Sequence, residues 1–206
     1  MNAKFLRKRP ESGEYNEITF SPGYFDDRWV LFEDNNYNEW VGIFGSGQFG
    51  CDKILFFPNT TIVFIIAKGK AYVIDIEKGD LAYEHTCDEN LTEVFLFGKR
   101  DIILTRGNLG VYYFTSKKLC DQIDFPGIDR IIIKNQNNDI IKCEIYACMD
   151  IFNLEINLKT NSMNMGNKIG KYDYPDPKTS YYFFDFKSYF KRLYYKIKNV
   201  IISMLK

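Results

Sequence analysis

Apolar and polar positions alternate in short blocks along most of the chain, and this pattern predicts β-strands rather than helices. Runs rich in Val, Ile, Phe, Tyr and Trp are separated by clusters of Asn, Asp, Gly and Lys. No convincing 3.6-residue apolar period occurs before about residue 177. Pairs of strand-like runs joined by a turn-type cluster predict four β-hairpins, at 28–33 with 39–44, 61–66 with 71–76, 101–105 with 111–115, and 139–146 with 151–158.

The predicted hairpins recur at a nearly constant spacing. Equivalent strands open at Ile62, Ile102 and Ile140, and the strands that follow them open at Ala71, Val111 and Ile151. Short apolar runs precede the hairpins and polar-flanked segments follow them, so each unit would contain three or four strands. Both series repeat with a period of about 40 residues, which in an all-β chain is typical of β-propeller blades.

One segment carries a resemblance to a known family. The segment at 71–85 reads AYVIDIEKGDLAYEH and resembles the last strands of a PQQ-like or WD-type propeller blade. It has an apolar-Asp-apolar run, then a Lys-Gly turn, then a short edge strand. VYYFTSKKLCDQIDF, at 111–125, is a degraded copy without the glycine. The chain lacks the Trp-Asp and Gly-His dipeptides of WD repeats. The resemblance covers about 25–160 and implies propeller-like repeated antiparallel hairpins in about four units, possibly an incomplete ring. A meander, a sandwich and a barrel are the alternatives.

The C-terminal part of the chain has a different character. Residues 161–180 are polar and contain two Gly and two Pro, which predicts a linker or wrapping loop between a β body at 1–160 and the C-terminus. Residues 181–206 predict a basic amphipathic helix, because apolar side chains recur at helical spacing. Its stripe consists of Phe186, Phe190, Leu193, Ile197, Val200 and Met204. This stripe would be buried by the β body, by a partner or by an anionic membrane, and we expect the β body.

Charge is distributed unevenly along the 206 residues, although 27 Lys and Arg balance 27 Asp and Glu. Four basic residues and no acid lie in 1–10, and six basic residues and one acid lie in 181–206. The intervening stretch 11–180 therefore has 17 basic and 26 acidic residues. Such a field repels nucleic acid and attracts basic partners. With no run of 18 apolar residues and no signal-like N-terminus, we expect a cytoplasmic protein.

Residues with possible catalytic or ligand-binding chemistry are few. Gly45–Gly50 matches the GxGxxG of dinucleotide-binding folds, but a strand-like run follows it where that motif needs a helix, so we expect a connection between blades.

His85, the only histidine, has Cys87 and Glu84 nearby. These are too few ligands for zinc, so a packing or surface role is the simpler interpretation. We expect no cofactor, no metal and no enzymatic activity. Free thiols are expected for the five cysteines, Cys51, Cys87, Cys120, Cys143 and Cys148, and burial is expected for Cys120, Cys143 and Cys148.

Acidic residues cluster in the predicted turns. They could be solvated loops, a general acid/base pair in a cleft, or a docking face for a basic protein. Given the acidic body, we predict that a set of eight binds a partner: Asp26, Asp27, Glu33, Asp34, Glu39, Asp88, Glu89 and Glu93.

A non-catalytic protein-binding module is the function class that these features favour. The Asn-, Lys-, Ile- and Tyr-rich composition suggests an AT-rich bacterial genome. By type rather than by motif, the chain resembles immunity proteins of bacterial toxin–immunity pairs, which implies binding and neutralisation of a basic nuclease-type toxin domain, because nucleases hold phosphates with basic surfaces. The alternative is a membrane-peripheral scaffold that uses 181–206. The oligomeric state is left open.

Overall fold

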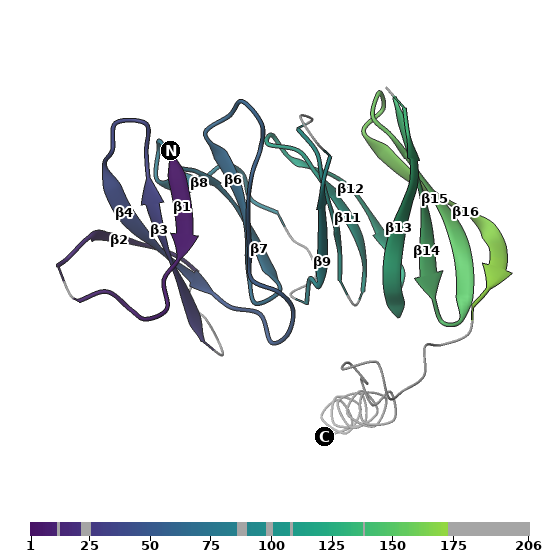
Figure 1. Ribbon diagram of the computed structural model, residues 1–206, viewed down its shortest axis with the longest axis horizontal. Coiled ribbons are helices and arrows are strands. Elements are labelled where there is room, and N and C mark those ends of the chain that lie inside the picture. The colour runs from purple at the N-terminus through teal and green to yellow at the C-terminus, as the bar shows by residue number, and fades with distance from the viewer. Residues whose placement is uncertain are drawn as a thin grey trace, which may run out of the picture. The chain divides into compact units, whose positions relative to one another are not determined.

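The described part of the chain is made of β-strands. The computed structural model contains sixteen of them, in four sheets of four strands each (Figure 1). The all-β prediction is therefore confirmed. The predicted C-terminal helix at 181–206 lies outside the described residues. The structure describes residues 1–11, 13–21, 26–85, 90–97, 101–107, 109–137 and 139–172.

Sheets B, C and D are antiparallel meanders in which each strand pairs with the next along the chain. The three hairpins predicted between residues 61 and 158 are confirmed, as are the short strands before them. Sheet B contains β5 (Lys53–Phe56), β6 (Ile62–Ala67), β7 (Lys70–Asp75) and β8 (Asp80–Leu81). Sheet C contains β9 (Glu93–Leu96), β10 (Ile103–Arg106), β11 (Gly110–Phe114) and β12 (Leu119–Asp124). Sheet D contains β13 (Ile128–Gln136), β14 (Ile140–Ala147), β15 (Asp150–Asn157) and β16 (Ser162–Lys171).

Sheet A departs from this meander. Its strands are β1 (Asn2–Phe5), β2 (Asn16–Ser21), β3 (Asp27–Glu33) and β4 (Glu39–Gly45), in the order β1-β3-β4-β2. The predicted β3–β4 hairpin is confirmed, but the outer strand β2 comes from before the hairpin and pairs parallel to β4. The sequence did not predict β1 and β2, which lie outside the predicted repeat.

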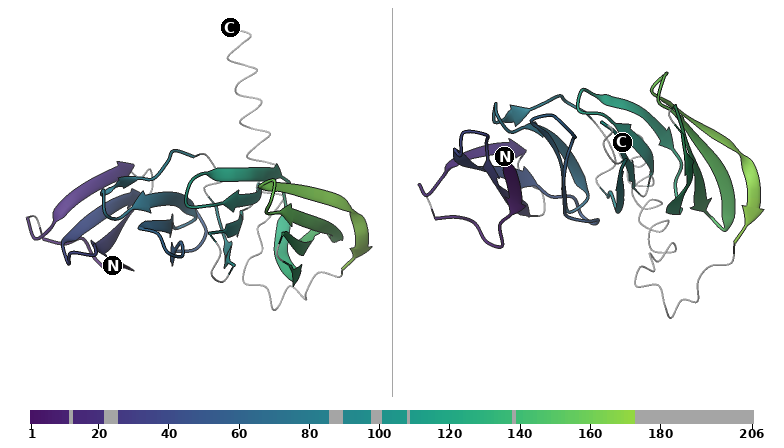
Figure 2. Two further views of the ribbon diagram at one scale, coloured as in Figure 1. Left: turned by 90° about the horizontal axis from the view of Figure 1, so that it is seen from above. Right: turned by 45° about the horizontal axis from the view of Figure 1, so that its top comes forward.

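The sheets stand side by side in chain order, and an apolar core fills each space between neighbours (Figure 2). Alternate residues of one strand serve two cores: Ile65 on β6 packs between sheets A and B, whereas Phe64 packs between sheets B and C. This is why the central strands of sheets B and C are apolar on both faces. Face-to-face stacking of four-stranded sheets is propeller-like. Within the described residues, no apolar core joins sheet A to sheet D.

The prediction of a linker or wrapping loop at 161–180 is wrong for the first half of this segment. Residues 162–171 form β16, the ten-residue edge strand of sheet D, and the compact β unit runs from Met1 to Lys171 rather than ending at 160. Only Met163 is buried on this strand, whereas most of its side chains face solvent. An edge strand with one solvated face needs few apolar residues, so its polar composition suggested a loop.

Candidate partner-binding surfaces

The structure does not bring together the six predicted acidic residues that it describes. Asp27 pairs with Gly45 at one end of the β3–β4 hairpin, and Glu33 pairs with Glu39 at the other end. The seven residues of β3 separate these ends by about 20 Å. Glu93 lies on β9, in a different sheet. Asp88 and Glu89 lie outside the described residues.

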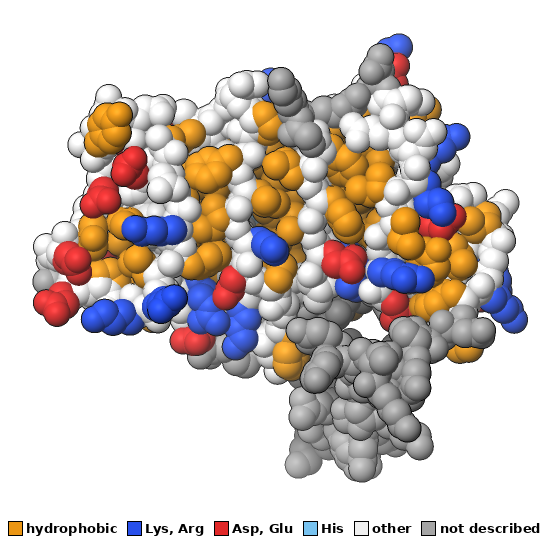
Figure 3. All heavy atoms as spheres, in the orientation of Figure 1, with side chains coloured by type: hydrophobic (Ala, Val, Ile, Leu, Met, Phe, Trp, Pro, Cys, Tyr) orange, Lys and Arg blue, Asp and Glu red, His pale blue; other side chains and the backbone are white. Residues whose placement is uncertain are grey.

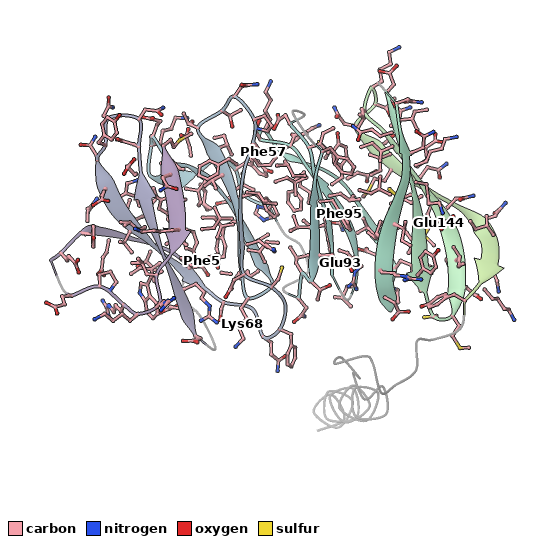
Figure 4. The ribbon with its side chains drawn as sticks, in the orientation of Figure 1. Phe5, Phe57, Lys68, Glu93, Phe95 and Glu144 are labelled. Carbon is pink, nitrogen blue, oxygen red and sulfur yellow. The ribbon has the colours of Figure 1, made fainter. Side chains whose placement is uncertain are left out.

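Asp26 belongs to a local charge network. Its Oδ2 accepts a hydrogen bond from Arg28 Nη1 at 3.0 Å, and this bond holds the pKa of the Asp26 carboxyl below its usual value. Arg28 Nε also donates to Asp52 Oδ2 at 3.2 Å, and the other Asp52 oxygen accepts the Lys68 backbone N–H at 2.6 Å. Lys68 lies at the end of sheet B that faces this network (Figure 4). The network ties sheet A to sheet B, and basic groups offset the charge of Asp26.

Asp34 organises the tip of the β3–β4 hairpin. Although it is nearly buried, its carboxylate accepts hydrogen bonds from the backbone N–H groups of Asn36 and Asn38 and from Asn38 Nδ2, each at 2.8 Å. These bonds, with the Asn38 side chain first, hold the pKa of Asp34 below its usual value. Tyr37 stands at this tip with a positive φ of 63° and a side chain that is 82% exposed. Asp34 therefore fixes the tip, while Tyr37 is the group presented to solvent.

Two further carboxylates of the predicted set flank this tip. Glu33 and Glu39 are direct cross-strand partners, so their side chains leave the sheet on the same face. Like charges placed opposite each other destabilise a β-ladder, which makes this pair a cost to the fold. Glu77 adds a third carboxylate, because its Oε1 accepts the Asn35 backbone N–H at 3.2 Å. The tip is therefore acidic and carries one exposed aromatic ring.

Glu93 has an internal role instead. Its Oε2 lies 3.0 Å from Nε of Arg106, a nearly buried residue of β10, and also accepts the Ile131 backbone N–H at 3.3 Å. Arg106 Nη1 donates to the Ile128 carbonyl. This Glu93–Arg106 clasp joins sheets C and D, because Ile128 and Ile131 belong to β13. The sequence offered no sign of the clasp, since the four residues are distant along the chain.

The glycine-rich segment connects sheet A to sheet B, as the sequence predicted. β5 follows Gly45–Gly50, where a dinucleotide fold would place a helix. A Cβ atom on Gly50 would lie 2.3 Å from the Leu91 carbonyl oxygen and 2.6 Å from Gly69 Cα. Three backbone hydrogen bonds of 3.0 Å link Cys51, Gly69 and Leu91 around this point. Gly50 is therefore explained by the convergence of three chain segments.

His85 packs between sheets B and C. Its ring centroid lies 5.8 Å from that of Tyr83 and 5.3 Å from that of Phe114, which is fully buried. Among the described residues, Nδ1 is buried without a hydrogen-bond partner. Burial lowers the pKa of the imidazole. The neutral ring therefore acts as a packing group. Cys87, its neighbour in the sequence, lies outside the described residues.

The stability of the protein should decrease as the pH falls below about 6.5, the ordinary pKa of histidine. Between this pH and the lower pKa of folded His85, the unfolded chain binds a proton that the folded chain does not, so acidification favours unfolding. We expect the melting temperature to be several degrees lower at pH 5.5 than at pH 7.5. Replacement of His85 by Gln should flatten this dependence. An unchanged slope in the variant would assign the effect to another group.

The described cysteines differ in exposure and are free thiols, as predicted. Cys143 is buried in the core between sheets C and D, and burial raises the pKa of its thiol to about 12. Cys51 and Cys120 are half-buried, whereas Cys148 is exposed in a turn, so the predicted burial is confirmed for Cys143 and wrong for Cys148. In the described part of the chain, no three His, Cys, Asp or Glu side chains form a group that could hold a metal ion.

A shallow hollow on sheet A has a volume of only about 30 Å³. Its lining residues are Asn2, Lys4, Leu31, Phe32, Glu33 and Glu39. Sites for small-molecule ligands usually enclose some 300 Å³ or more, so this hollow has room for a water molecule or two and not for a substrate.

Among the described residues, no helix is long and apolar enough to cross a membrane.

No protein-family model matches this chain, and no curated protein sequence matches it. Among solved structures, the chain is similar to the WD40 domain of SCAP from fission yeast, with 10% sequence identity and a TM-score of 0.40. The match covers 64% of this chain and 33% of the SCAP chain, so it spans about a third of that structure. The description of the fold therefore rests on the four sheets and three cores given above.

Proposed function

We propose that this protein is a non-catalytic protein-binding module that contacts its partner through the tip of the β3–β4 hairpin. The observation that carries the proposal is the geometry of this tip, where Asp34 fixes the turn and Tyr37 is 82% exposed. Tyrosine is enriched at binding hot spots because it offers a large, amphipathic contact area with little rotamer entropy to lose. Glu33 and Glu39 beside it bring negative charge to the rim.

The charge of the tip selects a basic partner. Exposed carboxylates steer a cationic surface during encounter, and the stretch 11–180 as a whole has nine more acidic than basic residues. The narrower form of the proposal is a bacterial cytoplasmic immunity protein that covers the basic surface of a nuclease-type toxin domain. The support for this form is compositional: an acidic body and the absence from the sequence of a recognisable catalytic motif.

A membrane-peripheral scaffold is the second candidate. Residues 181–206 carry six basic residues, one acid and an apolar stripe at helical spacing. Such a segment suits the interface of an anionic bilayer. Flotation of the full-length chain with anionic vesicles, and loss of flotation after deletion of 181–206, would support this candidate over the first.

The proposed function predicts fast, salt-sensitive association with a basic partner. The product of the neighbouring reading frame is the first partner to test, with binding measured by surface plasmon resonance. Replacing Glu33 and Glu39 by Lys should slow association by about tenfold and change dissociation less, because rim charges act mainly on encounter. Replacing Tyr37 by Ala should instead accelerate dissociation, by about tenfold or more, because it removes a central contact.

A matched control variant distinguishes the effect of the tip residues on association from the effect of net charge. Glu84 and Asp124 are exposed carboxylates away from the β3–β4 tip, and their replacement by Lys changes the net charge by the same amount. This control should alter association by less than about threefold at physiological ionic strength, where screening acts beyond about 8 Å. Equal effects of the two double variants, with no effect of the Tyr37 variant, would remove the tip from the proposal.

A further inference from the structure

Residues 6–11 and 13–15 form a strap on the outer side of sheet A, the side that faces away from sheet B (Figures 1 and 2). The strap joins β1 and β2, which are the two edge strands of sheet A and run in the same direction. β1 ends at Phe5, toward the base of the β3–β4 hairpin, and β2 begins at Asn16, beside Trp40 near the hairpin tip. The inner face of sheet A packs on sheet B, so the strap crosses the outer face from one edge to the other.

The face that the strap crosses is apolar along the central strands β3 and β4. Alternate residues of these strands point into the core between sheets A and B, so the residues between them point outward. The outward apolar residues are Trp29, Leu31, Val41 and Ile43. Leu31 is 6% exposed and Val41 is 0% exposed, although neither belongs to any of the three cores between sheets. Sheet A therefore has a second buried apolar face, and among the described strands no further sheet packs on it.

One ion pair anchors the strap to the sheet. Arg9 Nη2 lies 3.3 Å from Glu17 Oε2, and Glu17 is the β2 partner of Val41, so it stands on the same outer face. The other oxygen of this carboxylate, Oε1, is buried without a hydrogen-bond partner among the described residues. The side chain of Glu17 is 21% exposed and that of Arg9 is 64% exposed. Arg9 therefore supplies the counter-charge for a largely covered carboxylate, and loss of Arg9 should loosen the strap.

Apolar packing of the strap is limited. Its half-buried apolar side chains are Leu6, Pro10 and Tyr15, whereas Arg7, Lys8 and Arg9 are exposed. Leu6 also donates its backbone N–H to the Trp29 carbonyl at 2.8 Å. A segment with few buried apolar contacts opens at a lower free energy than the sheets beneath it.

The outer face of sheet D has the opposite character. Glu144 and Tyr146 alternate with core residues of β14, so they point away from sheet C. Lys134 Nζ lies 3.2 Å from Glu144 Oε1, and the Tyr146 hydroxyl donates to Glu144 Oε2 at 2.8 Å. The Arg130 guanidinium lies 4.2 Å from the centre of the Tyr146 ring. Figure 3 shows acidic and basic side chains next to one another at this end of the molecule. Covering these charges with an apolar face would desolvate them, so sheet D is a poor complement to the outer face of sheet A.

We propose that the strap is an intramolecular cap, held by the Arg9–Glu17 pair, that keeps the outer face of sheet A from packing on the same face of a second copy. Because the sheet D end is polar, the surface of this protein that best matches an apolar sheet A face is that face itself. Two identical faces related by a twofold axis form a closed contact, so the assembly stops at a dimer. The protein is therefore monomeric with the strap in place and dimerises through sheet A when the strap is displaced.

Arg9→Glu in the full-length protein tests the cap, because it places a second carboxylate beside Glu17 and repels the strap. We expect the mass of this variant, measured by light scattering after size exclusion, to double relative to the unmodified protein. Arg7→Glu is the matched control, since Arg7 is exposed on the same strap and forms no ion pair with the described residues. It should remain monomeric. Adding Ile43→Lys to Arg9→Glu should restore the monomer, because a lysine would then be buried in the dimer contact.

Tryptophan quenching reports the position of the strap independently of mass. Trp29 and Trp40 are the two tryptophans of the chain, so Trp40→Phe leaves only the one on the outer face of sheet A. In this background, at protein concentrations low enough to dissociate a dimer, Arg9→Glu should raise the acrylamide quenching constant about twofold, because the opened strap admits the quencher. Arg7→Glu should leave the quenching constant unchanged.

Several outcomes would overturn the proposal. They are a monomeric Arg9→Glu variant, an unmodified protein that is already dimeric, an equal mass change in Arg7→Glu, and a dimer that survives Ile43→Lys. A dimer without increased quenching would also contradict it, because the strap would have stayed in place. The inference does not rest on the β3–β4 tip. Loss of partner binding in the Tyr37 variant therefore leaves it standing, and the reverse also holds.

Discussion

Replacing Gly50 by Ala is expected to unfold the protein or to lower its free energy of unfolding by about 3 kcal/mol or more. The added Cβ would lie 2.3 Å from the Leu91 carbonyl oxygen and 2.6 Å from Gly69 Cα, and backbone atoms cannot rotate away as a side chain can. The φ of 115° adds strain for any residue with a Cβ. Urea unfolding monitored by tryptophan fluorescence measures the loss.

Gly13→Ala is the matched control for this variant. Gly13 also has a positive φ, of 84°, but a Cβ there would meet no atom within 4 Å. The Gly13→Ala variant therefore has the backbone strain without the collision, and its free energy of unfolding should be lower by only about 1 kcal/mol. If both variants lost the same stability, the convergence of chain segments at Gly50 would not be what requires glycine. A shift of the melting temperature by NAD or ATP would reopen the dinucleotide interpretation.

Replacing Arg106 by Ala should lower the free energy of unfolding nearly as much as the Gly50 replacement. Arg106→Ala leaves Glu93 and the Ile128 carbonyl without their donor at the junction of sheets C and D. Loss of one partner from a buried ion pair typically costs about 3–5 kcal/mol; because Glu93 is 32% exposed, we expect about 2–3 kcal/mol. Sheet D should also separate from sheet C more readily, which hydrogen exchange of β13 amides would detect.

The ion pair between Lys142 and Glu155 provides the comparison for Arg106. It lies on the solvent face of sheet D, with a nitrogen–oxygen distance of 4.0 Å and side chains that are 61% and 45% exposed. Lys142→Ala should therefore change stability by less than about 0.5 kcal/mol. A loss below about 1 kcal/mol for Arg106→Ala would mean that apolar packing, rather than the clasp, holds sheets C and D together.

The local pattern of the sequence was sufficient to predict most strands and the repeat. Strands such as β6 and β11 are apolar on both faces because each contributes to two cores, and such runs are easily recognised. In the turn-type cluster between β6 and β7, Gly69 has a φ of 93°, which glycine adopts without strain. The strands missed by sequence, β1, β2 and β16, are edge strands. One face of an edge strand can be solvated, and β1 and β2 pair with strands that do not follow them directly in the chain, so short-range pattern carries little information about these strands.

Residue type and sequence distance are poor guides to the roles of the acidic residues. All eight were expected in one partner-binding set on the basis of charge and position in turns. Asp26 instead pairs with Arg28, Asp34 binds the backbone of its own turn, and Glu93 pairs with an arginine of the next strand. The pairing decides whether a carboxylate is presented to solvent or used to hold the fold. Pairing depends on strand register and on the neighbouring sheet.

The sequence by itself determined the all-β class, the regular recurrence of the hairpins and the acidic body, because these follow from composition and local alternation. Only the tertiary structure decided which residues meet across sheets: the three chain segments at Gly50, the Glu93–Arg106 clasp, and the core between sheets A and B, against which Phe5 and Phe56 both pack. Such contacts join residues far apart in the chain. They arise when the sheets stack to bury their apolar faces, so they are a consequence of packing rather than of local preference.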